Sequence, residues 1–230
     1  MKIIIGVLSC LQKEYQDLVF ALKQTCFKNI PAEFEVYYIY GNGQCDGKYM
    51  MENSDFYSSY RDDEILSKTI DFFKYCNTYK KFDYILRTNT ACYWNLKLYY
   101  EHILNTVPKT NAYYGPIGDD PNVIKGQGRF ISGAGYLLSK DLISKIISNE
   151  KIIMSRHFTH HVHDDVSIGK FLYKDCGVPE LECPPNRIFV KASNINSKLD
   201  RTCYNYYCEN HHEPIRPNLL HTIHQYTKQC

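Results

Sequence analysis

The sequence predicts an α/β fold in which a mixed, mainly parallel β-sheet is flanked by helices. Short apolar runs of strand length alternate with segments whose apolar residues recur every three or four positions, as on one helix face. Strands that alternate with helices of this length are typical of a mainly parallel sheet covered on both faces. The 230 residues, 44% of them hydrophobic, suffice for one core, so we expect a single domain over 1–230.

The first half of the chain supplies most of the expected sheet. The strands predicted here are 3–8, 34–40 and 82–87. The first helix buries Leu18 and Leu22, and a later one carries Ile70 and Phe73 at helical spacing. Residues 46–63 are polar and aromatic without a clear period, which predicts a loop over the site.

The second half is expected to continue the alternation and then become irregular. A helix at 96–104 and an extended segment at 112–116 precede Ser139, which stands where a helix N-cap belongs. Trp94, the only tryptophan, is expected in the core, with stacking on a sugar or base as the alternative. Residues 182–230 contain short strand-like pieces and many polar residues, which we interpret as a lid or acceptor region.

Charge and cysteine content exclude some classes of function. The formal net charge is +2 and the basic residues are scattered, so no nucleic-acid partner is expected. The apolar start is too short to span a bilayer and no cleavage site follows it, so we expect a cytoplasmic protein without a transmembrane segment, its cysteines reduced. A metal-binding interaction module is the alternative class, and its zinc ligands would come from Cys183, Cys203, Cys208, His211 and His212.

Two adjacent acids, Asp164 and Asp165, open an apolar helix about thirty residues after the small-residue turn Gly133–Gly135. A carboxylate that takes a proton from a hydroxyl, near a turn that lets a ligand approach the backbone, suits sugar transfer. Ordinary capping of the helix N-terminus is the competing interpretation. Histidines 157, 160, 161 and 163 precede the acids and raise a second alternative, a bound metal ion.

Other candidate site residues come from the expected sheet topology. In open sheets of this type ligands bind outside the carboxyl ends of the strands, where Ser9, Asn89 and the Gly133 turn would lie. Backbone contact is expected at Ser9. Tyr114 and His163 are the candidates for binding the acceptor.

Four motifs in this order resemble the fringe and beta-1,3-galactosyltransferase group. They are Arg87-Thr88-Asn89-Thr90-Ala91-Cys92-Tyr93-Trp94-Asn95, Tyr114-Gly115-Pro116, Ser132-Gly133-Ala134-Gly135-Tyr136-Leu137-Leu138-Ser139 and Asp164-Asp165-Val166-Ser167-Ile168-Gly169. The resemblance covers residues 60–175. It implies a GT-A-like, Rossmann-type fold and a nucleotide-sugar donor, for which we expect a UDP-sugar, with a glycan or other hydroxyl compound as acceptor. It also implies an inverting transfer with Asp165 as catalytic base and Asp164 in support.

The chain departs from that group where a divalent ion is expected. The group's acidic triplet falls on Asn89-Thr90-Ala91, which offers no carboxylate to a hard cation. We therefore expect no metal ligands and no required cofactor, although a need for a divalent metal stays open. Arg87, Arg129, Lys191 and Arg201 are the candidates to neutralise the diphosphate, each of them alternatively a surface charge. The competing function is a catalytically inactive protein that binds a nucleotide sugar or glycan.

Overall fold

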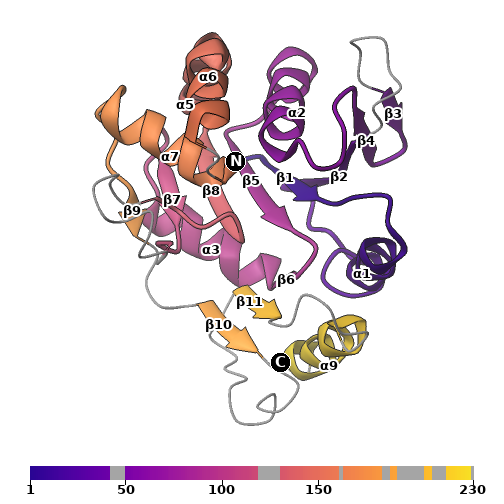
Figure 1. Cartoon of the computed structure of the whole chain (residues 1–230). Coiled ribbons are helices and arrows are strands. Elements are labelled where there is room, and N and C mark those ends of the chain that lie inside the picture. The colour runs from indigo at the N-terminus through magenta and orange to yellow at the C-terminus, as the bar shows by residue number, and fades with distance from the viewer. Residues whose placement is uncertain are drawn as a thin grey trace.

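An eight-stranded sheet forms the centre of the computed structural model, which describes residues 1–41, 50–118, 130–160, 163–182, 187–190, 205–208 and 216–228. In order across the sheet, the strands are β3 (Met50–Glu52), β4 (Asp55–Ser58), β2 (Phe34–Gly41), β1 (Ile3–Leu8), β5 (Tyr84–Asn89), β8 (Gly135–Ser139), β7 (Tyr113–Gly115) and β9 (Leu181–Glu182). Helices cover both faces of this sheet (Figure 1). The expected α/β class is confirmed.

The pairing of the strands is mixed. β1 runs parallel to β2 and β5, β4 runs parallel to β2, and β9 runs parallel to β7. β8 is antiparallel to both β5 and β7, and β3 is antiparallel to β4. Because β8 runs against β5, the start of β8 lies at the edge where β1 and β5 end. That edge is where the functional residues were expected.

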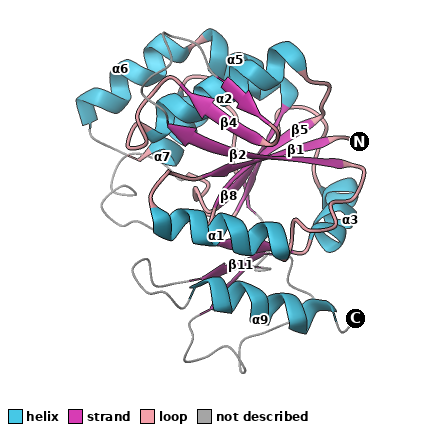
Figure 2. Ribbon diagram, turned by 90° about the vertical axis from the view of Figure 1, so that its right-hand side faces the viewer, coloured by secondary structure: helices cyan, strands magenta, loops and turns pink. Residues whose placement is uncertain are grey.

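Two layers of helices cover the faces of the sheet. The first layer contains α2 (Ile65–Tyr79), α5 (Lys140–Ser148), α6 (Glu150–His160) and α7 (Asp164–Lys174). The opposite face is covered by α1 (Lys13–Gln24), α3 (Leu96–Thr106), α9 (Arg216–Lys228) and a small second sheet (Figure 2). The small sheet contains β10 (Arg187–Val190), β11 (Asn205–Cys208) and β6 (Cys92–Trp94), in that order.

Both faces of the central strands are buried, which explains their continuous apolar runs. In β1, Ile3 and Ile5 face the α1 and α3 side, whereas Ile4 faces the α2 side. Side chains alternate between the two faces of a strand, so a strand covered on both sides is apolar at every position. No helix in the described part of the chain has the length and apolar composition needed to cross a membrane.

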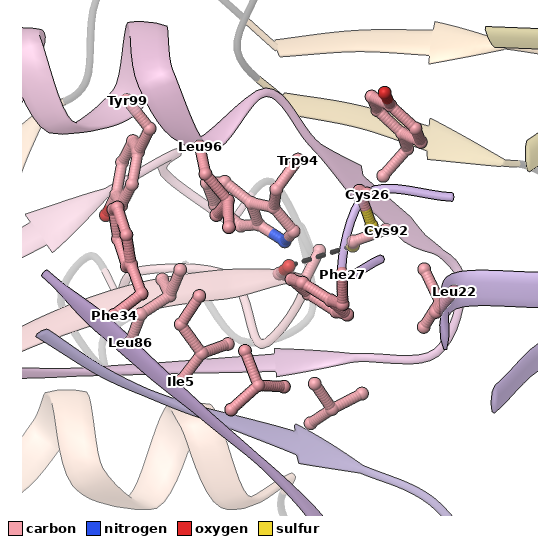
Figure 3. Close-up of a cluster of buried hydrophobic side chains, with 14 of the residues drawn as sticks. Ile5, Leu22, Cys26, Phe27, Phe34, Leu86, Cys92, Trp94, Leu96 and Tyr99 are labelled. Atoms are coloured by element: carbon pink, nitrogen blue, oxygen red, sulfur yellow. Dashed lines mark hydrogen bonds between the residues drawn. The ribbon is translucent and has the colours of Figure 1, made fainter. Parts of the chain in front are cut away.

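Trp94 lies in the core on the α1 and α3 side, as the sequence analysis expected (Figure 3). Its ring packs against Tyr99 with 4.8 Å between ring centroids, and its indole N–H donates to Thr88 Oγ1 at 3.1 Å. A buried indole N–H needs an acceptor, and Thr88 provides one. Trp94 therefore joins the small second sheet to the end of β5.

Several expected elements need correction. Residues 46–63 are not simply a loop, because β3 and β4 lie within them. Residues 150–160, for which no element was predicted, form α6, and the C-terminal region, expected to hold short strand-like pieces, ends in the helix α9. Ser139 precedes α5 but makes no side-chain cap, since its hydroxyl accepts the Ala112 N–H at 2.9 Å.

We expect Leu220→Ala to destabilise the fold by about 2 to 5 kcal/mol, the usual cost of truncating a buried leucine. Leu220 is fully buried in α9, which packs against the core on the α1 side. The measurement is the free energy of unfolding from urea denaturation. Gln225→Ala, on the exposed face of the same helix, is the control and should change it by less than about 0.5 kcal/mol. Equal effects would show that α9 is not docked as described.

Candidate functional site

The candidate site lies where β5 ends, β8 begins and α7 starts. The strand register places Arg87 opposite Tyr136 and Thr88 opposite Gly135. The turn before β8 therefore sits over the carboxyl end of β5. Asp164 and Asp165 form the first turn of α7, where carboxylates are favoured by the unpaired backbone N–H groups of a helix N-terminus.

Arg87 is the charged centre of this site. Its side chain is only 5% exposed, and its Nη2 donates to Asp164 Oδ2 at 2.6 Å. Its Nη1 donates to the Gly133 carbonyl oxygen, and the guanidinium lies over the Tyr136 ring at 5.4 Å from the centroid. Burial lowers the pKa of Arg87, but the charges of Asp164 and Asp165 outweigh it, so the pKa is raised overall. The guanidinium thus keeps its charge although it is enclosed by the protein.

Asp165 sits beside the pair but remains half-buried rather than enclosed. Its Oδ2 accepts the Gly133 N–H at 2.6 Å, and its Oδ1 accepts the Val166 N–H at 2.8 Å. Burial is the main reason that the pKa of Asp165 is raised, and the neighbouring Asp164 raises it further against the opposing effect of Arg87. A partly accessible carboxylate with a raised pKa has the properties of a general base.

The glycines of the turn are packed against the protein itself. A Cβ at Gly133 would lie 2.6 Å from Arg87 Nη1 and 3.0 Å from Asp165 Oδ2. At Gly135 it would lie 2.5 Å from Trp94 Cζ2. Arg87, Asp165 and Trp94 therefore occupy the space beside these glycines, and the role of Gly133 and Gly135 toward a donor stays a prediction.

Ser9 and Asn89 lie at the edge where they were expected. β1 and β5 run parallel, and Leu8 at the end of β1 pairs with Asn89 at the end of β5. Ser9 directly follows Leu8 and so lies at the same edge. Ser9 is buried, whereas Asn89 is half-buried and its Oδ1 accepts the Ala91 N–H at 3.0 Å. Asn89 thus stabilises the turn that leads into β6, and its role toward a donor stays a prediction.

The two acceptor candidates are placed apart. Tyr114 is buried in the core on the α3 side, where its hydroxyl bonds to His102, so it does not lie on the α7 face of the sheet. This placement argues against contact with the acceptor. His163 is exposed and immediately precedes Asp164, so its acceptor role stays a prediction.

The remaining predicted ligands are only partly covered by the structure. Arg129, Lys191 and Arg201 lie outside the described residues, as do the zinc candidates Cys183, Cys203, His211 and His212. Among the described histidines, cysteines and acids, no group could hold a metal ion. Cys208 is buried in β11, and the His157 ring bonds to Ser167 Oγ at 2.9 Å.

A second buried charge, Lys68, was missed in the sequence. Its Nζ donates to the Ser9 carbonyl oxygen at 3.0 Å and to Asp62 Oδ1 at 3.2 Å, and burial lowers its pKa. Asp62 in turn accepts the backbone N–H groups of Gly41 and Leu11. The pair therefore holds the ends of β1 and β2 together. The available signal was a lysine within the apolar stripe of α2.

Comparison with known proteins supports the fold. No family model matches the sequence, and no curated protein is similar to it in a sequence search. Among solved structures, the chain resembles a glycosyltransferase involved in the glycosylation of the major capsid of PBCV-1, with a TM-score of 0.58 and 12% sequence identity. The match covers 96% of this chain and 100% of that chain. At this identity the likeness establishes the shared fold.

We expect Gly135→Ala to lower the free energy of unfolding by about 1 to 3 kcal/mol, because the new methyl group would overpack the rigid Trp94 ring. Urea denaturation measures this change. Nucleotide-sugar binding per folded molecule, followed by calorimetry, should be unchanged, because Trp94 fills the space beside this glycine. Unchanged stability together with lost binding would restore the idea that Gly135 leaves room for a ligand.

Proposed function

We propose that this chain is a glycosyltransferase that moves a sugar from a nucleotide-sugar donor to a hydroxyl group of a glycan or another acceptor. The observation that carries the proposal is the half-buried Asp165 carboxylate, fixed by two backbone N–H groups at the carboxyl edge of the sheet. The similarity in fold to a glycosyltransferase supports it. So does the resemblance of the ordered motifs to the fringe and beta-1,3-galactosyltransferase group.

In this proposal Asp165 is the general base of an inverting displacement. The carboxylate takes the proton from the acceptor hydroxyl as the oxygen forms a bond to the anomeric carbon. The bond between that carbon and the diphosphate oxygen breaks, and the nucleoside diphosphate leaves with its electron pair. Asp164 does not share this role, because it is 7% exposed and bound to Arg87.

The donor diphosphate needs positive charge as it leaves. Asn89-Thr90-Ala91 stands where the group that the motifs resemble holds its metal ion, and none of these three side chains is a carboxylate. Thr90 and Ala91 are also buried. We therefore propose a UDP-sugar donor whose diphosphate is neutralised by arginine or lysine side chains. Arg129, Lys191 and Arg201 remain the candidates for this role.

A protein that binds a nucleotide sugar without turnover is the second candidate function. The missing acidic triplet favours it. Transfer or donor hydrolysis, followed by release of nucleoside diphosphate across a panel of UDP-sugars and GDP-sugars, separates the two candidates. The cytoplasmic location stays a prediction that none of these features tests.

We expect Asp165→Asn to reduce transfer by about 100- to 10,000-fold, the usual effect of removing a general base. An amide keeps the shape of the side chain but does not accept the proton. The measurement is kcat for sugar transfer, with donor affinity from calorimetry as the control, which should change little. Turnover at the wild-type rate would remove Asp165 from the role of base.

Donor binding is expected to survive EDTA, since Asn89-Thr90-Ala91 offers no carboxylate to a divalent ion. Donor binding should also weaken as the salt concentration rises from about 0.05 to about 0.5 M, because salt screens the contacts between cationic side chains and phosphates. The thermal shift caused by the UDP-sugar measures both effects when it is recorded with EDTA, with manganese and across the salt series. A strict requirement for manganese would contradict a donor site built from cationic side chains.

A further inference from the structure

We infer that Arg87 is a positioning residue for Asp165 and not a ligand of the donor diphosphate. The inference rests on the proposed function, in which Asp165 is the base. The sequence had made Arg87 a candidate to neutralise the donor diphosphate, whereas this inference makes it a residue that orients Asp165.

Gly133 is held through both of its backbone polar groups. Its carbonyl oxygen accepts from Arg87 Nη1, and its N–H donates to Asp165 Oδ2 at 2.6 Å. Arg87 and Asp165 therefore both bind Gly133, and a Cβ built on Gly133 would contact both of them. A shift of the guanidinium would move the turn and, through it, the carboxylate.

Arg87 is also joined to Asp165 through the backbone of α7. Its other terminal nitrogen binds Asp164, the residue directly before Asp165, at 2.6 Å. The guanidinium thus fixes the first turn of α7 against β5, because β5 carries Arg87 and α7 begins at Asp164. Two separate connections, one through Gly133 and one through Asp164, set the position of the base.

A phosphate has little access to Arg87. Its side chain is 5% exposed, and each terminal nitrogen binds a group inside the protein. Its Nε has no hydrogen-bond partner among the described residues, but this atom is also buried. A diphosphate would have to enter this enclosed site and compete with the Asp164 carboxylate, which is costly to leave buried without a partner. A neutralising contact with the donor is therefore better supplied from elsewhere in the chain.

Arg87 also affects the charge of Asp165. Among the described residues, the groups that interact electrostatically with Asp165 are Arg87 from β5, Tyr113 from β7, Tyr136 from β8 and Asp164 from α7. Burial raises the pKa of both tyrosines. Since the tyrosines stay neutral, Arg87 and Asp164 are the opposing charges. Arg87 lowers the pKa of Asp165 and Asp164 raises it. Loss of the guanidinium alone should leave the base protonated up to a higher pH.

The test compares three changes at this pair with one at the surface. Arg87→Lys keeps the charge but loses the two-pronged geometry. Arg87→Met removes the charge and leaves Asp164 buried without its partner, which can prevent folding. The double variant Arg87→Met/Asp164→Leu replaces the whole pair with apolar side chains and so avoids a buried unpaired charge. Arg156→Met is the control, because Arg156 makes a similar two-pronged pair with Asp175 at the exposed end of α7.

A positioning role predicts that kcat falls by about 100-fold in Arg87→Lys, as expected for a displaced catalytic group. Donor affinity should stay within about 2-fold, since a group that does not touch the donor contributes nothing to its binding. The acidic limb of the kcat/KM profile should stay in place in Arg87→Lys and move to higher pH in Arg87→Met. The double variant should keep the low kcat with donor affinity unchanged. Arg156→Met should leave all of these values unchanged.

Weakened donor binding with an unchanged acidic limb would overturn the inference and return Arg87 to the diphosphate. Titration of the Asp165 carboxyl carbon by NMR, with the signal assigned through Asp165→Asn, tests the inference without any substrate. A midpoint that is higher in Arg87→Met than in wild type supports it, and an unchanged midpoint contradicts it. A wild-type protein without transferase activity would sink the proposed function while leaving this titration decisive.

Discussion

The buried ion pair between Arg87 and Asp164 is the interaction on which the candidate site depends. Both side chains are at most 7% exposed, so each charge has lost nearly all of its contact with water. Such burial is costly unless each charge keeps a partner, and removing one partner typically costs about 3 to 5 kcal/mol. The arrangement is therefore tightly determined, and the elements that carry the two residues are held together at the edge of the sheet.

The rest of the site follows from this pair. The second terminal nitrogen of Arg87 holds the Gly133 carbonyl, and only a glycine fits between Arg87 and Asp165. Asp165 then takes the Gly133 N–H and remains half-buried, with a pKa raised mainly by burial. One carboxylate of the adjacent acids is thus enclosed with Arg87, and the other, which is half-buried, is the one proposed to act on a substrate. A different environment gives two identical side chains different roles.

Periodicity predicted much of the fold and part of the site. The runs at 3–8 and 34–40 predicted β1 and β2 because both faces of these strands are buried, and Trp94 was expected in the core. The pairing of Arg87 with Asp164 was not predictable from periodicity, because the two residues are 77 positions apart in the sequence. The Gly133 turn, which Arg87 also binds, is brought to it by the antiparallel pairing of β8 with β5. Lys68 was overlooked for a similar reason, since its partners lie at the ends of other strands.

The central claim, that Arg87 acts through Asp165, is tested most directly by a double-mutant cycle on kcat/KM. The four proteins are wild type, Arg87→Lys, Asp165→Asn and the double variant, with rates normalised to the folded fraction. Residues that act as a unit show non-additive losses. The account predicts that Arg87→Lys costs almost nothing further once Asp165→Asn is present. Losses that multiply, with Arg87→Lys costing the same factor in both backgrounds, would contradict it.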